Sequence, residues 1–175
     1  MPRRFTRGIY LKSRLSPQYY KELIWYGYEE SDHIGLKGGQ AKTYLLKPRY
    51  NESAEHFFVI KQIEKFIRRH TKWIKLYASV EADIIFSWRG TEYAIEVETG
   101  KKLRRSNPRI ENKVRNLNQK YPSHWFFVVT NWKHKRVYQK YGPTYVRKEV
   151  PQLLKNKLFA VGSKFCVGEP KSAKF

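Results

Sequence analysis

Two short apolar runs joined by a glycine-containing turn, with acidic residues at their outer ends, constrain this fold most. Residues 84–86 and 93–95 are apolar, and residues 88–91 between them contain Gly90. This pattern predicts a β-hairpin. In a twisted hairpin the start of one strand lies beside the end of its partner. Asp83, which precedes the first run, is therefore expected to converge with Glu96 and Glu98, which close the second.

These carboxylates indicate a metal ion. Side chains alternate along a strand, so Glu96 and Glu98 share one face and lie ~7 Å apart. Two like charges at that separation repel, and a cation relieves the repulsion best. Oxygen-rich sites of this kind suit Mg²⁺, with Mn²⁺ as the alternative ion. Ordinary ion pairs with some of the 36 lysines and arginines are the competing interpretation.

The charge and the cysteine content of the chain indicate which binding partners and which cellular compartment to expect. The net charge is +21 and the pI is about 10.1, which favours a polyanionic partner. Nucleic acid is the first expectation and an anionic membrane surface the competitor. No apolar run approaches the ~18 residues of a membrane helix, and no signal-peptide pattern is present. The only cysteine, Cys166, excludes an internal disulfide and a cysteine-rich zinc site. A cytoplasmic protein is expected.

The acidic residues also carry a family resemblance. Asp83, the hairpin, and Glu96-X-Glu98 followed by Thr-Gly-Lys-Lys resemble the motif of the PD-(D/E)XK nuclease superfamily. Asp83 and Glu96 match the motif, and Glu98 stands where lysine is usual. Some restriction endonucleases of this fold carry glutamate there and remain active. The resemblance covers about residues 53–157.

The resemblance implies Mg²⁺-dependent hydrolysis of DNA. Asp83, Glu96 and the backbone carbonyl of Val97 would hold the ion, as in the family. Glu98 would orient or deprotonate the attacking water, or bind a second ion. The cation that the usual lysine supplies could come instead from one of three lysines near the motif: Lys101, Lys102 and Lys113.

A helix ahead of the hairpin can add to this site. Residues 52–70 form the strongest helical pattern in the chain, with a cap at Asn51 or Ser53 and one apolar stripe. The helix in this position often gives a glutamate to the site in the nuclease family, so Glu55 or Glu52 is expected to complete it. The alternative is that these acids only stabilise the first helical turn. His56 lies on the stripe, as a hydrogen-bonded core histidine or as a contact of the site.

The remaining patterns predict the fold class. We expect a strand at 73–77, a helix at 110–121, a buried strand at 124–130, a helix at 131–141, an edge strand at 145–146 and a helix at 149–157. This order indicates an α/β protein. Residues 50–160 would form a restriction-endonuclease-like core, in which helices flank a mixed central sheet.

The flanking segments are basic. Residues 1–16 are predicted to be irregular, residues 17–26 to form a helix, and Gly38-Gly39 to turn a hairpin with a basic tip. Residues 1–49 resemble the last helix and wing of a winged-helix DNA-binding domain. Alternatively, this hairpin extends the central sheet. Residues 161–175 form a basic tail.

We expect DNA as the partner, because a basic run follows the acidic pair directly. The predicted DNA contacts are Lys101, Lys102, Arg104, Arg105, Arg109, Lys113, Lys37 and Lys42. The leading function is a Mg²⁺-dependent DNA nuclease. The alternatives are a non-catalytic DNA-binding protein on the same fold, or a basic RNA-binding protein. A homodimer would supply the two sites that cleavage of both strands requires.

Overall fold

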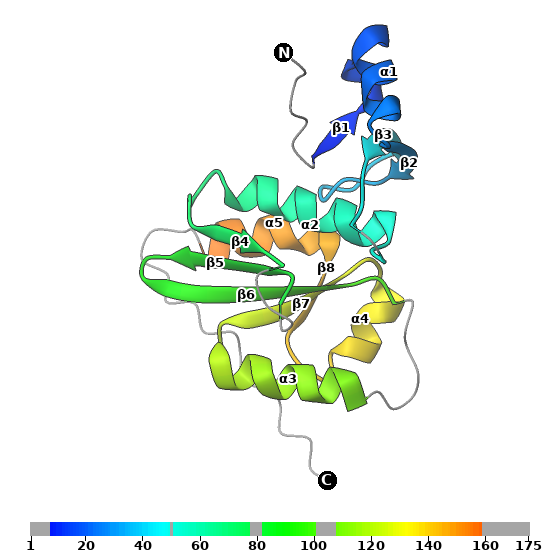
Figure 1. The fold of residues 1–175 in the computed structure, drawn as a ribbon. Helices are drawn as coiled ribbons and strands as arrows, with labels where there is room; N and C mark the ends of the chain where they lie inside the picture. The colour runs from blue at the N-terminus through cyan, green and yellow to red at the C-terminus, as the bar shows by residue number, and fades with distance from the viewer. Residues whose placement is uncertain (1–7, 50, 78–81, 101–107, 159–175) are drawn as a thin grey trace.

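The chain folds around two β-sheets and five α-helices in the residues described by the computed structural model, 8–49, 51–77, 82–100 and 108–158 (Figure 1). One sheet has five strands and lies between two layers of helices. The other has three strands and belongs to the N-terminal part of the chain. No helix in these described ranges is both long and apolar enough to cross a membrane.

The five-stranded sheet is mixed and has the order β4-β5-β6-β7-β8. Strands β4 (Ile74–Leu76), β5 (Ile84–Trp88) and β6 (Thr91–Glu98) are antiparallel neighbours. Strands β7 (Trp125–Val129) and β8 (Thr144–Val146) then continue parallel to β6. The α/β class with a mixed central sheet is thereby confirmed. The order also makes β8 an edge strand, as predicted.

The β5–β6 hairpin is confirmed, with a two-residue turn. Trp88 pairs with Thr91, and between them Arg89 and Gly90 have φ values of 50° and 80°. Positive φ at both central residues is the geometry of the turns that match the twist of two antiparallel strands. Glycine adopts it without strain. The turn fixes the register of the hairpin and therefore the position of every residue at its other end.

Helices cover both faces of the five-stranded sheet (Figure 1). Helices α2 (Ala54–Ile67) and α5 (Val150–Leu153) lie on one face. Helices α3 (Pro108–Lys120) and α4 (Trp132–Tyr138) lie on the other. Ser53 caps α2 by accepting a hydrogen bond from the His56 N–H at 3.3 Å, so the predicted capped helix is confirmed. A 3₁₀ turn (Arg147–Glu149) precedes α5, and a π-helical turn (Leu154–Leu158) follows it.

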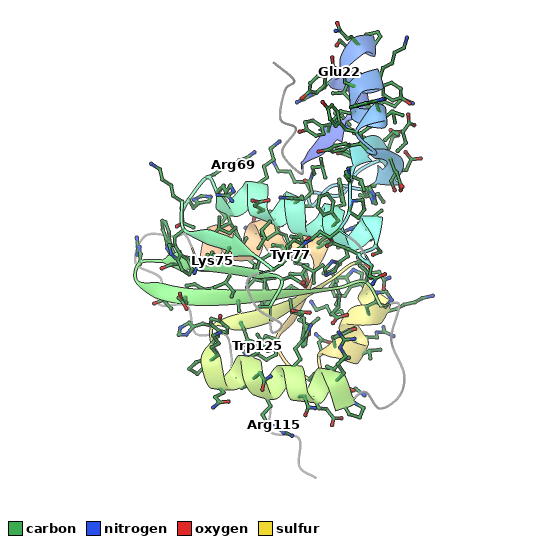
Figure 2. All side chains as sticks on the ribbon, in the orientation of Figure 1. Glu22, Arg69, Lys75, Tyr77, Arg115 and Trp125 are labelled. Carbon is green, nitrogen blue, oxygen red and sulfur yellow. The ribbon has the colours of Figure 1, made fainter. Side chains whose placement is uncertain are left out.

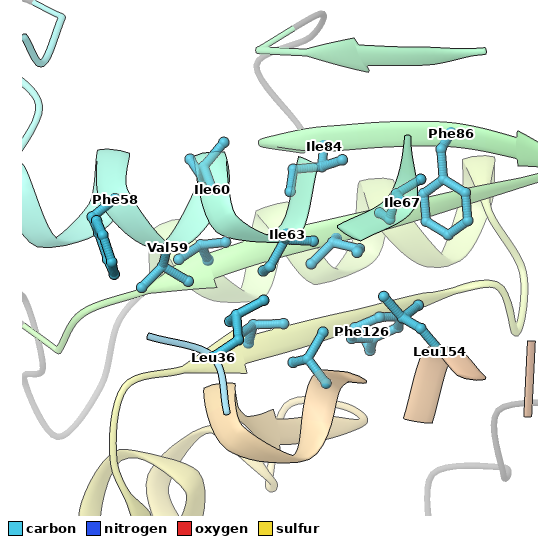
Figure 3. Close-up of a cluster of buried hydrophobic side chains, with 14 of the residues drawn as sticks. Leu36, Phe58, Val59, Ile60, Ile63, Ile67, Ile84, Phe86, Phe126 and Leu154 are labelled. Atoms are coloured by element: carbon cyan, nitrogen blue, oxygen red, sulfur yellow. The ribbon is translucent and has the colours of Figure 1, made fainter. Parts of the chain in front are cut away.

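Alternating side chains of the strands fill the two cores. Figure 3 shows the first core, in which Ile60 and Ile63 of α2 belong to one cluster with Ile84 and Phe126 of the sheet. The second core lies on the α3 and α4 face and includes Phe127. All five residues of β7 are buried, which confirms the predicted central strand.

A tryptophan anchors α3 to the sheet. Trp125 of β7 extends toward α3 (Figure 2). Its indole Nε1 donates a hydrogen bond to Asn118 Oδ1 at 2.8 Å. The same ring closes against the backbone of Gly142, where an added Cβ would lie 2.3 Å from the ring.

The N-terminal part forms its own sheet. Strands β1 (Ile9–Leu11), β2 (Glu29–His33) and β3 (Lys42–Leu46) have the order β1-β3-β2, and α1 (Pro17–Trp25) packs on them. The helix and the hairpin are confirmed. The irregular structure predicted for residues 1–16 is wrong for residues 9–14, which form β1 and a 3₁₀ turn (Lys12–Arg14). The alternative that this hairpin extends the central sheet is also wrong. The likeness to a winged helix stays a prediction.

Helix α2 joins the two sheets. Leu36 and Leu46 of the N-terminal part belong to the same core cluster as α2. Glu55 of α2 contacts His33 Nδ1 of β2 at 2.7 Å and accepts a hydrogen bond from Arg147 at 2.7 Å. Because these partners come from both ends of the chain, Glu55 serves as a connection between the two sheets.

Ile63→Ala should destabilise the protein by about 2–5 kcal/mol, because Ile63 is fully buried between α2 and the sheet. Urea unfolding measures this change in the free energy of unfolding. Lys65→Ala, on the exposed side of the same helix, is the control and should change stability by no more than about 0.5 kcal/mol. Equal losses in the two variants would contradict the packing described.

Candidate functional site

The register of the hairpin brings Asp83 to Glu96. Strand β5 begins at Ile84, which pairs with Ile95 of β6. One step further out, Asp83 stands opposite Glu96, and opposite residues of antiparallel strands share a face. Asp83 Oδ2 accepts a hydrogen bond from the backbone N–H of Val97 at 2.8 Å. The carboxylate thus takes the place of a strand partner beyond the end of β5.

Two helices hold the glutamates of β6. Lys113 of α3 donates a hydrogen bond to Glu96 Oε1 and forms an ion pair with it. Tyr138 of α4 donates a hydrogen bond to Glu98 Oε2 at 2.9 Å. Both helices lie on the face of the sheet toward which Glu96 and Glu98 project. The predicted convergence of Asp83, Glu96 and Glu98 at one end of the hairpin is therefore present.

The start of α2 and the residue just before its cap add a histidine and a fourth carboxylate. His56 Nδ1 lies 2.8 Å from Glu52 Oε1, and His56 Nε2 lies 3.2 Å from Asp83 Oδ2. Tyr77, which follows β4, donates a hydrogen bond to Glu52 Oε1 at 2.6 Å (Tyr77 is labelled in Figure 2). The Arg49 guanidinium lies 4.4 Å from the centre of the Tyr77 ring. A hydrogen-bonded chain thus runs from Tyr77 to Asp83.

All of these groups line one open cavity of about 430 Å³. It is formed by the ends of β5 and β6 together with α2, α3 and α4. Its walls combine acidic, basic and aromatic side chains: Arg49, Asn51, Glu52, Ser53, His56, Tyr77, Asp83, Glu96, Val97, Glu98, Thr99, Arg109, Ile110, Lys113 and Tyr138.

The surroundings of Glu96 disfavour the charged form of its carboxyl group. Its residue is 4% exposed. Burial, followed by the charge of Asp83, raises the pKa of Glu96 to about 8 even though Lys113 opposes the rise. Burial also disfavours the charge of Lys113, but the Glu96 carboxylate outweighs that effect and raises the pKa of Lys113. The cavity therefore holds a proton-exchanging carboxyl group beside a firmly charged ammonium.

His56 balances the opposite side of the cavity. Burial opposes its charge, but the hydrogen bonds to Asp83 and Glu52 outweigh burial and raise the pKa of His56 to about 10. Near neutral pH it is therefore a cation. The lining holds four acidic residues and four basic ones: Glu52, Asp83, Glu96 and Glu98 against Arg49, His56, Arg109 and Lys113. Because the raised pKa leaves Glu96 mostly protonated near neutral pH, the basic groups outnumber the charged carboxylates in the described lining.

The acidic side chains of the cavity can be compared with what a metal ion needs. In the described ranges no group of three or more His, Cys, Asp or Glu side chains is arranged to hold a metal ion. Mg²⁺ needs only one or two carboxylates and keeps several waters. The described contacts of Asp83 use Oδ2, and those of Glu96 use Oε1.

The structure gathers some of the predicted site residues and separates others. Asp83, Glu96, Val97, Glu98, Arg109 and Lys113 all line the cavity. Glu55 does not line it, and the other glutamate considered, Glu52, does. The side chain of Glu55 instead pairs with His33 and Arg147. Lys37 and Lys42 are exposed on the β2–β3 hairpin. The remaining predicted contacts lie outside the described residues: Lys101, Lys102, Arg104 and Arg105.

Sequence patterns did not identify the two tyrosines and the arginine of the cavity. Tyr77 and Tyr138 each donate a hydrogen bond to a carboxylate of the site, and Arg49 packs on Tyr77. They come from three separate segments, so no short spacing connects them. The one available signal was a tyrosine within the helical pattern after β7, and that pattern is equally typical of core packing.

Comparisons of the chain with protein-family models, with curated protein sequences and with solved structures give no match. The interpretation of the cavity therefore depends on its own geometry and chemistry.

The stability of the metal-free protein should fall as the pH rises from 5 to 8. The folded-state pKa of Glu96, about 8, exceeds its ordinary value of 4.5, so the folded state binds more protons in this interval. The slope from this one group reaches at most about 1.4 kcal/mol per pH unit. The raised pKa of His56 extends the decline above pH 6.5. Urea unfolding in EDTA at several pH values measures it.

Glu96→Gln should flatten this decline, most clearly between pH 5 and 6.5, where His56 is protonated in both states. Glu92→Gln, at an exposed position of the same strand, should keep the wild-type slope. An unchanged slope in Glu96→Gln would show that Glu96 does not titrate in this interval.

Proposed function

We propose that this chain is a Mg²⁺-dependent nuclease that hydrolyses phosphodiester bonds of DNA. One observation carries the proposal: Asp83, Glu96, Glu98 and Lys113 come from the hairpin and from α3 and line one open cavity. Carboxylates can hold a metal ion for phosphodiester hydrolysis, and an ammonium can stabilise the charge on the phosphate. The net charge of +21 supports a polyanionic substrate.

The fold supports the same proposal at a coarser level. An antiparallel hairpin, a helix and a parallel buried strand follow one another as β5–β6, α3 and β7. This is the order expected for a restriction-endonuclease-like core. We propose that the motif of that family is Asp83 with Glu96-X-Glu98. The third motif position is usually a lysine, and here it is Glu98. Lys113 of α3 would provide the missing cation.

Each group of the cavity then has a role. Asp83, Glu96 and the carbonyl of Val97 would hold Mg²⁺, which when bound neutralises charge on the phosphate and acidifies a water. Glu98, held by Tyr138, would accept the proton of the attacking water as its oxygen bonds to phosphorus. The Lys113 ammonium would stabilise the charge on the phosphoryl oxygens. The bond between phosphorus and the leaving oxygen breaks in the same displacement.

A non-catalytic DNA-binding protein is the second candidate, and a specific observation favours it. Lys113 pairs with Glu96, and His56 pairs with Asp83. These cations neutralise the two carboxylates that would otherwise attract a metal ion. If they hold the carboxylates permanently, the cavity is a structural polar cluster and the basic surface alone binds DNA.

Cleavage assays separate the two candidates. Plasmid, linear and branched DNA incubated with Mg²⁺ or Mn²⁺ should be cut, and EDTA should abolish cutting. Asp83→Asn, Glu96→Gln and Lys113→Met should each lower the rate by about 100-fold or more. The first two variants weaken the binding of the ion, and the third removes the positive charge at the reacting phosphate. Glu92→Gln and Glu55→Gln should cut within about twofold of wild type, because neither residue lines the cavity. DNA binding without cutting by the wild type would favour the second candidate.

Metal binding can be tested without catalysis. A ligand that binds only the folded state raises its stability, so Mg²⁺ or Mn²⁺ should raise the melting temperature of the wild type. Asp83→Asn should remove most of this rise, because the ion loses one of two carboxylate ligands. Glu92→Gln should retain it. An equal rise in Asp83→Asn would place the ion elsewhere, and no rise in the wild type would contradict the proposed cofactor.

A further inference from the structure

Trp132 is an exposed aromatic side chain at the edge of the sheet that carries the cavity. Its residue is 51% exposed, although a tryptophan usually buries most of its surface. The Lys135 ammonium lies 4.5 Å from the centre of a Trp132 ring, and the Lys148 ammonium lies 5.5 Å from it. Half of the tryptophan is thus open to a partner, beside the exposed Lys148 and beside Lys135, whose charge Glu149 neutralises.

The sheet topology places this tryptophan near the proposed cleavage site. Strands β6, β7 and β8 are parallel neighbours, so their carboxyl ends lie at one edge. Glu98 ends β6, Trp132 follows the end of β7, and Lys148 follows the end of β8. Two strand spacings separate β6 from β8, which is ~10 Å. That span corresponds to about three nucleotides at the 3.4 Å rise of one DNA strand.

Helix α4 connects the two places physically. Tyr138 of α4 donates its hydrogen bond to Glu98. An added Cβ at Gly100, just beyond β6, would lie 2.1 Å from His134 Nε2 of α4. Figure 1 shows α4 beside the end of β6. A strand that leaves the cavity along this edge would therefore meet α4 and Trp132.

The charge around Trp132 suits a nucleic acid. Residues 131–148 contain no Asp or Glu and six basic residues: Lys133, Lys135, Arg136, Lys140, Arg147 and Lys148. Glu149, the next residue, accepts hydrogen bonds from Lys135 at 2.8 and 3.0 Å, and Arg147 pairs with Glu55. An aromatic ring among lysines is typical of proteins that bind single-stranded nucleic acid.

We propose that Trp132 stacks on an unpaired base, while the exposed Lys148 contacts a neighbouring phosphate. The protein would then prefer DNA with unpaired nucleotides next to the scissile bond, such as flaps, gaps or single strands. The preference for a cleavage substrate rests on the proposed nuclease function. The stacking itself does not, because it requires neither metal ion nor catalysis.

Binding measured in EDTA tests the stacking alone. The probes are a fluorescein-labelled oligothymidylate and a labelled blunt duplex, measured by fluorescence anisotropy at one fixed salt concentration. Trp132→Ala should weaken oligothymidylate binding by about 5- to 150-fold and change duplex binding by no more than about twofold. Trp132→Phe should retain most of the binding, because its ring still stacks. Trp132→Leu keeps an apolar side chain without a ring and should bind as weakly as Trp132→Ala.

Trp25→Ala is the matched control. Trp25 is more exposed, at 79%, but it ends α1 in the N-terminal part, and its removal should leave both affinities unchanged. Equal losses for oligothymidylate and duplex, full binding by Trp132→Leu, or the same loss in Trp25→Ala would overturn the proposal. Failure of the wild type to bind oligothymidylate would overturn it too. Circular dichroism checks that each variant is folded.

Two further measurements distinguish DNA binding from membrane binding, and base stacking from the nuclease function. Tryptophan among lysines is also typical of surfaces that contact anionic membranes. If Trp132→Ala loses binding to phosphatidylserine vesicles but not to oligothymidylate, the surface belongs to a membrane and the DNA proposal is wrong. If stacking is confirmed but no DNA is cut with Mg²⁺ or Mn²⁺, the nuclease function fails and single-strand binding stands. If both hold, flapped DNA should be cut faster than blunt duplex by wild type but not by Trp132→Ala.

Discussion

The pairing of Asp83 with the backbone of Val97 determines the geometry of the site. The β5–β6 ladder ends at Ile84 and Ile95, and beyond it the Val97 N–H would lack a partner from β5. Buried backbone donors are almost always satisfied. Asp83 satisfies this one with its side chain at 2.8 Å. The bond anchors the carboxylate beside Glu96, and the repulsion between these acids is then a property of the hairpin itself.

Side chains of the helices around the sheet offset that repulsion. Each acid at the end of the hairpin has a partner from a different helix: His56 of α2, Lys113 of α3 and Tyr138 of α4. Coulomb interactions in a partly buried site are stronger than in water, so these contacts also orient the helices relative to the sheet. The polar cavity is consequently part of the tertiary structure. Replacing one acid with its amide would relieve the charge while preserving its shape, which is why such variants separate chemistry from folding.

Local patterns were sufficient for the central sheet and its helices. The alternating and continuous apolar runs gave β5, β6 and β7, and the stripe on α2 gave its buried face, because burial follows directly from periodicity. The same patterns were insufficient where long-range contacts decide. Strand β1 is only three residues long, which is too short for a recognisable pattern, and it forms because β3 pairs with it. The choice between Glu52 and Glu55 also needed the structure, since the two are only three residues apart and the fold decides which neighbours each one meets.

In the proposed nuclease, the position of Lys113 would link catalysis to packing. A lysine on the motif strand would be placed by the hairpin alone, whereas Lys113 is placed by α3, which the buried side chains of Ile110 and Leu117 hold against the sheet. Its ammonium reaches Glu96 only if that packing is intact. A cavity made under α3 should therefore move a charge within the site, even though the altered residue touches no carboxylate. Glu98 accepts a hydrogen bond from Tyr138 of α4, so both flanking helices are parts of the same site.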